Sequence, residues 1–275
     1  MLLIQRENSD EPAAGTSLAI LYESKSSASR SGWGGARNSA SRTTDFIRLH
    51  AALNLIESAR SAITAGLPFN RHLTVHWALG GIPDSRAAQI TGRLVKLIAD
   101  WVKKGGGQFA YLWVRETGNR KGTHVHILLH LPKGLQFGQM TRRWTRRLMG
   151  KAPRGAVLTK AIGGSANAAF SGSGWYEDNL ASVVAYLLKG VSEEAGEALG
   201  LDKTEAGGRI IGKRSAVSQN IGSARRKCLN GSRLASGIQP KSSLESPTAG
   251  VFEQSFRIAE NHNFADDLGK SGEAV

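Results

Sequence analysis

The chain has 275 residues, and its 36 Lys and Arg against 22 Asp and Glu give a formal net charge of +14. An apolar share of 40% is enough for one sizeable folded domain, and the excess of positive charge makes a polyanion the first partner to consider, with a solvated basic surface as the alternative. The single cysteine, Cys228, excludes an intramolecular disulfide, and the sequence shows neither a signal-peptide pattern nor an apolar run of membrane-spanning length. We therefore expect a soluble, cytoplasmic protein without a membrane partner.

The first half of the chain predicts a leader followed by helices and strands. Residues 1–43 are rich in Ser, Gly, Ala and Arg, which is typical of a disordered leader. Asp45 stands where the N-cap of a helix is expected, and Gly66 ends that helix. The periodicity then predicts, in order, a strand over 72–79, a helix over 84–104, and strands over 108–116 and 122–130 joined by a polar turn.

The second half continues this pattern. It predicts a helix over 137–149, a strand over 156–162, and a helix that Asp178 or Asn179 caps and that runs to about Lys189. The order of elements favours an α+β sandwich with a largely antiparallel sheet.

Composition also predicts how the chain is divided. We expect one domain over 44–230, of which about 203–230 form a basic appendage. Residues 231–275 are polar and aperiodic, so a flexible tail is expected there.

Two histidines share one face of the strand over 122–130. In His124-Val-His126 the alternation of a strand puts both imidazoles on one side and the apolar neighbours on the other. Two imidazoles on a stiff strand suit a divalent metal, whereas the alternative is a pair of ordinary histidines on a half-exposed strand. Glu116 joins the histidine face if it pairs opposite or diagonal to His124, but a shift by one residue sends it to the other face.

Tyr186 and Lys189 are three residues apart on the last predicted helix and share a face. Packing is the common role of a tyrosine in such an aliphatic helix and is the alternative here. Tyr176 is a weaker candidate nucleophile because it precedes the expected helix cap. Tyr111 is expected to belong to the core.

Two further histidines are expected to stay outside the metal site. His130 lies roughly 13 Å along the strand from His126, too far to share a metal, and is expected to be structural or to face DNA. His76 could approach from the first strand, but a satisfied core histidine is the favoured interpretation.

The residues between 117 and 176 contain no Asp or Glu, so a positive field surrounds the two histidines. Recognition of duplex DNA is assigned either to the helix with the four arginines or to the appendage over 209–227. The basic residues expected to bind DNA are Arg120, Lys121, Arg142, Arg143, Arg146, Arg147 and Lys151.

In combination, His124-Val-His126 with upstream Glu116 and the helical Tyr186-Leu-Leu-Lys189 resemble the HUH endonucleases. More narrowly, the chain is similar to the rolling-circle replication initiators of bacterial plasmids and small single-stranded DNA phages. The resemblance covers about residues 70–190 and includes the strand Leu73-Thr-Val-His-Trp77. It implies a central five-stranded sheet flanked by helices.

The resemblance also implies an activity. A divalent cation, Mg²⁺ or Mn²⁺, would be held by His124, His126 and Glu116, and Tyr186, assisted by Lys189, would nick single-stranded origin DNA. The products would be a 5′-phosphotyrosine and a free 3′-hydroxyl. Implied partners are origin DNA, a host helicase and polymerase, and, because the motif has a single tyrosine, a transient second copy of the chain.

Three alternatives remain open at the level of sequence. A small mobilisation relaxase or a transposase would use the same chemistry. A non-catalytic protein that binds single-stranded nucleic acid would use the basic residues and tryptophans alone. A hydrolytic metalloenzyme would use His124, His126 and His130 and leave Tyr186 without a role.

Overall fold

The computed structural model describes residues 42–118, 121–135, 137–201 and 203–226. The expected leader lies outside the described residues except for its last two positions, and the expected tail lies outside them entirely. Arg120 and Cys228 also lie outside. The division of the chain into leader, domain and tail therefore stays a prediction.

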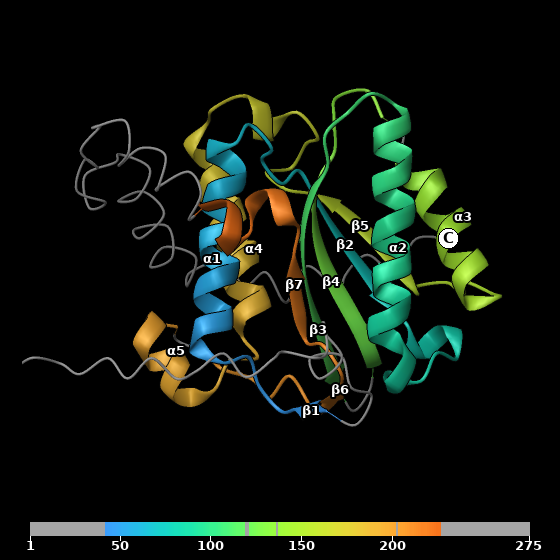
Figure 1. The fold of residues 1–275 in the computed structure, drawn as a ribbon, viewed down its shortest axis with the longest axis vertical. Helices are drawn as coiled ribbons and strands as arrows, with labels where there is room; N and C mark the ends of the chain where they lie inside the picture. The colour runs from blue at the N-terminus through green and yellow to red at the C-terminus, as the bar shows by residue number, and fades with distance from the viewer. Residues whose placement is uncertain (1–41, 119–120, 136, 202, 227–275) are drawn as a thin grey trace, which may run out of the picture. The chain divides into compact units, whose positions relative to one another are not determined.

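A five-stranded sheet forms the centre of the described part of the chain (Figure 1). All neighbouring strands are antiparallel, so the predicted α+β fold with an antiparallel five-stranded sheet is confirmed. In sheet order the strands are β5 (Val157–Ala161), β2 (Arg71–His76), β4 (Gly122–His130), β3 (Ala110–Gly118) and β7 (Ser215–Val217).

Helices cover both faces of this sheet, with α1 (Leu49–Thr64) and α4 (Gly174–Leu188) on one side and α2 (Asp84–Lys104) and α3 (Phe137–Met149) on the other (Figure 1). Alternation along β4 divides its apolar residues between two cores. Leu128 packs in the core with α1 and α4, whereas Val125 and Ile127 pack in the core with α2 and α3. His124 and His126 thus share the face of α1 and α4.

The remaining elements are short. Two small strands, β1 (Thr43–Thr44) and β6 (Ile210–Ile211), pair with each other, and α5 (Glu193–Leu199) follows α4. Three 3₁₀ turns are η2 (Ala78–Gly80), η3 (Ala168–Phe170) and η4 (Gln219–Ile221). No helix of the described segments has both the length and the apolar character required to cross a membrane.

The start of α1 differs from its prediction. Asp45 is not the N-cap; Arg48 takes that position and makes no side-chain capping bond. The reason is tertiary, because β1 is paired with β6 and Ile47 forms a bridge to Val191. These partners hold the backbone extended up to the first helical residue.

The start of α4 also differs. The helix begins at Gly174, with Ser173 as N-cap, so neither Asp178 nor Asn179 caps it. Tyr176 consequently lies inside the first turn, where its buried hydroxyl donates a hydrogen bond to the Phe69 carbonyl at 2.8 Å. This anchor explains the early start and gives Tyr176 a structural role.

The segment expected as a basic appendage contributes to the sheet itself. Its strand β7 pairs with β3. Arg214, which is buried, donates hydrogen bonds to the carbonyl oxygens of Thr44, Gly207 and Gly208. Much of its positive charge therefore has a structural use.

Candidate metal and tyrosine site

The β3–β4 pairing places Glu116 directly opposite His124, so the uncertain register is resolved in favour of a shared face. The distance from His124 Nε2 to Glu116 Oε2 is 3.5 Å, and both side chains are buried. One ligand atom from each of Glu116, His124 and His126 can be chosen so that all lie within 4.8 Å of one another. The predicted triad is thus brought together.

Hydrogen bonds orient both imidazoles. His124 Nδ1 lies 2.9 Å from the Gly122 carbonyl, which can only accept, so Nδ1 carries the hydrogen and Nε2 keeps its lone pair. His126 Nδ1 lies 3.0 Å from Thr74 Oγ1 and 3.2 Å from His72 Nε2. His126 Nε2 is buried and has no hydrogen-bond partner among the described residues.

These unsatisfied atoms test whether a metal fits. A buried polar atom without a partner costs about 1–3 kcal/mol, and Glu116 Oε1 is a second such atom in the described part of the site. Two imidazole nitrogens and a carboxylate oxygen are a donor set that divalent cations accept. The three residues therefore fit a divalent cation, while the choice between Mg²⁺ and Mn²⁺ stays a prediction.

The C-terminal end of α4 brings the tyrosine motif to this triad. The Tyr186 ring lies 5.3 Å from the His126 ring between centroids. Lys189 Nζ lies 4.6 Å from the centre of the Tyr186 ring, 3.4 Å from Glu116 Oε2 and 3.3 Å from Glu205 Oε2. Together these residues line a cavity of about 310 Å³.

Burial opposes ionisation of Tyr186. Burial raises the pKa of its phenol, Lys189 lowers it, and Glu116 raises it, with a raised pKa as the result. The expected help from Lys189 is present but is outweighed. Burial lowers the pKa of Lys189 while Glu116 raises it, and because the net shift is upward this residue keeps its ammonium charge.

Strand β2 supplies site residues that the sequence interpretation missed. His72, Thr74 and His76 alternate along β2 and all line the cavity. The His76 and His124 ring centroids lie 5.1 Å apart, and His76 Nδ1 is buried without a partner within the described chain, so the interpretation of His76 as a satisfied core residue is wrong. The period-two pattern His-x-Thr-x-His was the available signal.

Burial keeps these additional histidines neutral. Burial, with a contribution from the charge of Lys160, lowers the pKa of His72 to about 4. Burial and the neighbouring His124 lower the pKa of His76 to about 4. Burial also lowers the pKa of His126 well below its ordinary value. Neutral imidazole is the form that binds metals.

Other candidate residues lie outside the cavity. His130 Nδ1 donates a hydrogen bond to the Pro68 carbonyl at 2.9 Å, and its ring packs against Phe170, which favours the structural role. Tyr111 is partly buried against the core of α2 and α3. Among the basic residues, Lys121 is exposed at the rim of the cavity, whereas the four arginines of α3 do not line it.

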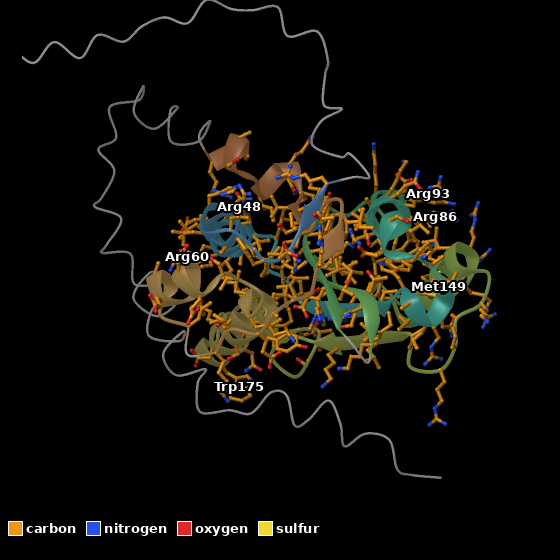
Figure 2. All side chains as sticks on the ribbon, turned by 90° about the horizontal axis from the view of Figure 1, so that it is seen from below. Arg48, Arg60, Arg86, Arg93, Met149 and Trp175 are labelled. Atoms are coloured by element: carbon orange, nitrogen blue, oxygen red, sulfur yellow. The ribbon has the colours of Figure 1, made fainter. Side chains whose placement is uncertain are left out.

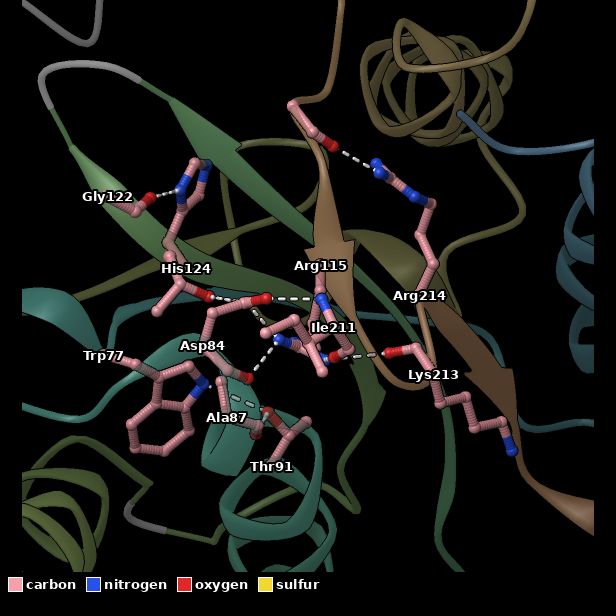
Figure 3. A network of polar contacts seen from close by, with 12 residues as sticks. Trp77, Asp84, Ala87, Thr91, Arg115, Gly122, His124, Ile211, Lys213 and Arg214 are labelled. Carbon is pink, nitrogen blue, oxygen red and sulfur yellow. Dashed lines mark hydrogen bonds and ion pairs between the residues drawn. The ribbon is translucent and has the colours of Figure 1, made fainter. Parts of the chain in front are cut away.

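A buried ion pair supports the triad from the reverse face of the sheet (Figure 3). Asp84, at the start of α2, accepts hydrogen bonds from the Arg115 guanidinium, from the Ile211 backbone N–H and from Thr123 Oγ1. Arg115 directly precedes Glu116, and Thr123 directly precedes His124. One carboxylate thus joins β3, β4 and β6 beneath two of the three candidate ligands.

Comparison with known proteins agrees with this geometry. Residues 81–193 match the family model described as Replication-associated protein ORF2. The matched range contains Glu116, both histidines, Tyr186 and Lys189. No curated protein and no solved structure matches the chain. Over these residues the chain therefore carries a domain of this replication-associated protein family, as the similarity to rolling-circle replication proteins predicts.

Proposed function

We propose that the protein nicks single-stranded origin DNA by transesterification through Tyr186 and so starts rolling-circle replication. The observation that carries this proposal is the meeting, in one cavity, of a buried His-His-Glu triad with a tyrosine and a lysine from a distant helix. A protein that only binds DNA has no need for this combination.

In the proposed reaction the Tyr186 oxygen forms a bond to phosphorus while the bond from phosphorus to the 3′-oxygen breaks. The phenol loses its proton, and the departing 3′-oxygen takes one up to become a hydroxyl. The 5′-phosphate stays on Tyr186 as a phosphodiester, so a later 3′-hydroxyl can reverse the step without a nucleotide cofactor. The free 3′-hydroxyl can serve as a primer for a polymerase.

His124, His126 and Glu116 would hold the divalent cation, which supplies positive charge to polarise the scissile phosphate. Lys189 adds a fixed positive charge beside the Tyr186 ring and favours the phenolate over the phenol. Thr74 and His72 act as acceptors for the Nδ1 hydrogen of His126, which directs its Nε2 toward the triad.

The rim of the cavity suits a single strand. Lys121 and Lys160 line it with positive charge that a phosphate backbone requires. Leu158, with 42% of its surface exposed, adds an apolar contact on the same rim that a base can cover.

The test is incubation of the full chain with 5′- and 3′-labelled single-stranded oligonucleotides that tile the replicon encoding it, with Mn²⁺ or with a chelator, followed by denaturing gels. We expect Mn²⁺-dependent cleavage and a protein-linked 5′ product, both lost in Tyr186→Phe. The matched control is Tyr176→Phe on the same helix, which should cleave normally because its hydroxyl only bonds the Phe69 carbonyl. Cleavage that persists in Tyr186→Phe would refute the assignment.

A further inference from the structure

We propose that the exposed face of α3 is a docking surface for duplex DNA that flanks the single strand in the cavity. The inference rests on the proposed function, since it assigns a second part of the same substrate to a second surface. The surface is defined by Arg142, Arg143, Arg146 and Arg147, and is called the α3 arginine surface below.

The α3 arginine surface carries charge that the fold does not use. All four arginines are exposed, and none of their side chains forms an ion pair or hydrogen bond with another described residue. The opposite side of the helix holds it in place, because Trp144 packs on Trp101 of α2 with ring centroids 5.5 Å apart. Four cations are thus presented on a rigid support.

Arginine spacing and type match a phosphate backbone. Positions 142 and 147 are separated by about 7.5 Å along the helix axis, so the four guanidinium groups form a compact cluster that can meet several phosphates. Guanidinium groups bind phosphate oxygens through paired hydrogen bonds, which ammonium groups cannot do. The absence of Asp and Glu from residues 117–176 leaves no acidic neighbour in the sequence to neutralise them.

The chain after α3 connects this surface to the cavity. Lys151 and Arg154 are both exposed on the connection between α3 and β5. The same connection reaches the site, because the Ala156 carbonyl accepts a hydrogen bond from the His76 backbone N–H at 2.8 Å. Basic side chains therefore lead from the α3 arginine surface toward the rim, where Lys160 follows on β5.

The competing segment, about residues 209–226, has less unused charge. Arg214 is buried by its hydrogen bonds to backbone carbonyls. Arg226 donates to Asn54, Ser58 and Ile221, and Lys213 lies over the Trp113 ring at 6.0 Å. These side chains fasten β7 and η4 to the rest of the fold. Of the two basic segments, α3 is the one that is available to DNA.

The probe is a DNA hairpin of arbitrary sequence with a 20-base-pair stem and a 12-nucleotide single-stranded arm, compared with the arm alone. Fluorescence anisotropy gives the dissociation constant at several salt concentrations. In Arg142→Ala/Arg146→Ala we expect the affinity for the hairpin to fall about tenfold and the slope of log K against log salt to drop by about 2, one unit for each lost phosphate contact. Affinity for the arm alone should stay within about twofold.

The matched control is Arg48→Ala/Arg225→Ala, which removes the same charge from exposed positions on the α1 side (Figure 2). Figure 2 shows Arg48 and Met149, the last residue of α3, on opposite sides of the molecule. The control should retain wild-type affinity for the hairpin. Arg142→Lys/Arg146→Lys should retain most of the salt dependence but bind more weakly.

Three results would overturn the proposal: unchanged hairpin binding in Arg142→Ala/Arg146→Ala, an equal loss in the control, or equal binding of an RNA hairpin with the same stem. Failure of the proposed function reads differently, because it is the absence of Tyr186-dependent cleavage in the wild type. A selective loss of hairpin binding would support the α3 arginine surface even then.

Discussion

Removing the carboxylate of Asp84 should destabilise the protein and weaken the candidate metal site together. In Asp84→Ala the Arg115 side chain, which is fully buried, loses its only carboxylate partner among the described residues. Breaking a buried ion pair by removing one partner costs about 3–5 kcal/mol. Arg115 keeps the carbonyl oxygens of Asp84, Ile211 and Lys213 as acceptors, so we expect the lower end of this range, about 3 kcal/mol.

For a folded domain of this size, 3 kcal/mol corresponds to a fall in melting temperature of about 6–12 °C. Calorimetry or circular dichroism measures this shift. Because Thr123 and Arg115 adjoin two candidate ligands, we also expect the Mn²⁺ dissociation constant, measured by titration calorimetry on the folded variant, to rise about tenfold. The double variant Asp84→Leu/Arg115→Met should be less destabilised than the sum of the single variants, since it leaves no unpaired buried charge.

A fall in melting temperature of less than about 2 °C in Asp84→Ala would refute the energetic reasoning. An additive double variant would show that the two side chains are not coupled. Unchanged Mn²⁺ affinity in a destabilised variant would separate the ion pair from the site and leave it a purely structural contact.

Two further predictions concern the neutral histidines. Thr74→Val removes an acceptor from His126 Nδ1 and should raise the Mn²⁺ dissociation constant about tenfold by titration calorimetry, with a larger effect when His72→Phe removes the second acceptor; Thr145→Val, which only loses a bond within α3, should leave the constant unchanged, and equal losses in both variants would contradict the orienting role. Because burial lowers the pKa of His72 and His76 from 6.5 to about 4, the unfolded chain binds more protons between these values, so the free energy of unfolding in urea should fall as the pH drops from 6.5 toward 4. His72→Gln/His76→Gln should show a weaker pH dependence over this window, and an identical slope would mean that other groups cause it.

Local pattern in the sequence was sufficient for most of the elements and for half of the site. The alternation in β4 put His124 and His126 on one face, and helical spacing put Tyr186 beside Lys189, because side-chain direction within an element follows from its own period. The apolar stripes likewise predicted α2 and α3, since burial of one helix face is visible in the spacing of its residues. The expected starts of α1 and α4 were wrong where contacts from β6, Val191 and Phe69 decided them.

Only the tertiary structure decided which elements meet. The pairing of β2 with β4 brought His72, Thr74 and His76 to the triad, and the packing of α4 set Lys189 against Glu116 and Glu205. Asp84 read as an ordinary first residue of a helix, yet it joins three strands behind the metal ligands. Such contacts link positions far apart in the chain, and no local period encodes them. The sequence by itself therefore determined the two halves of the candidate site, and the fold determined that they form one cavity.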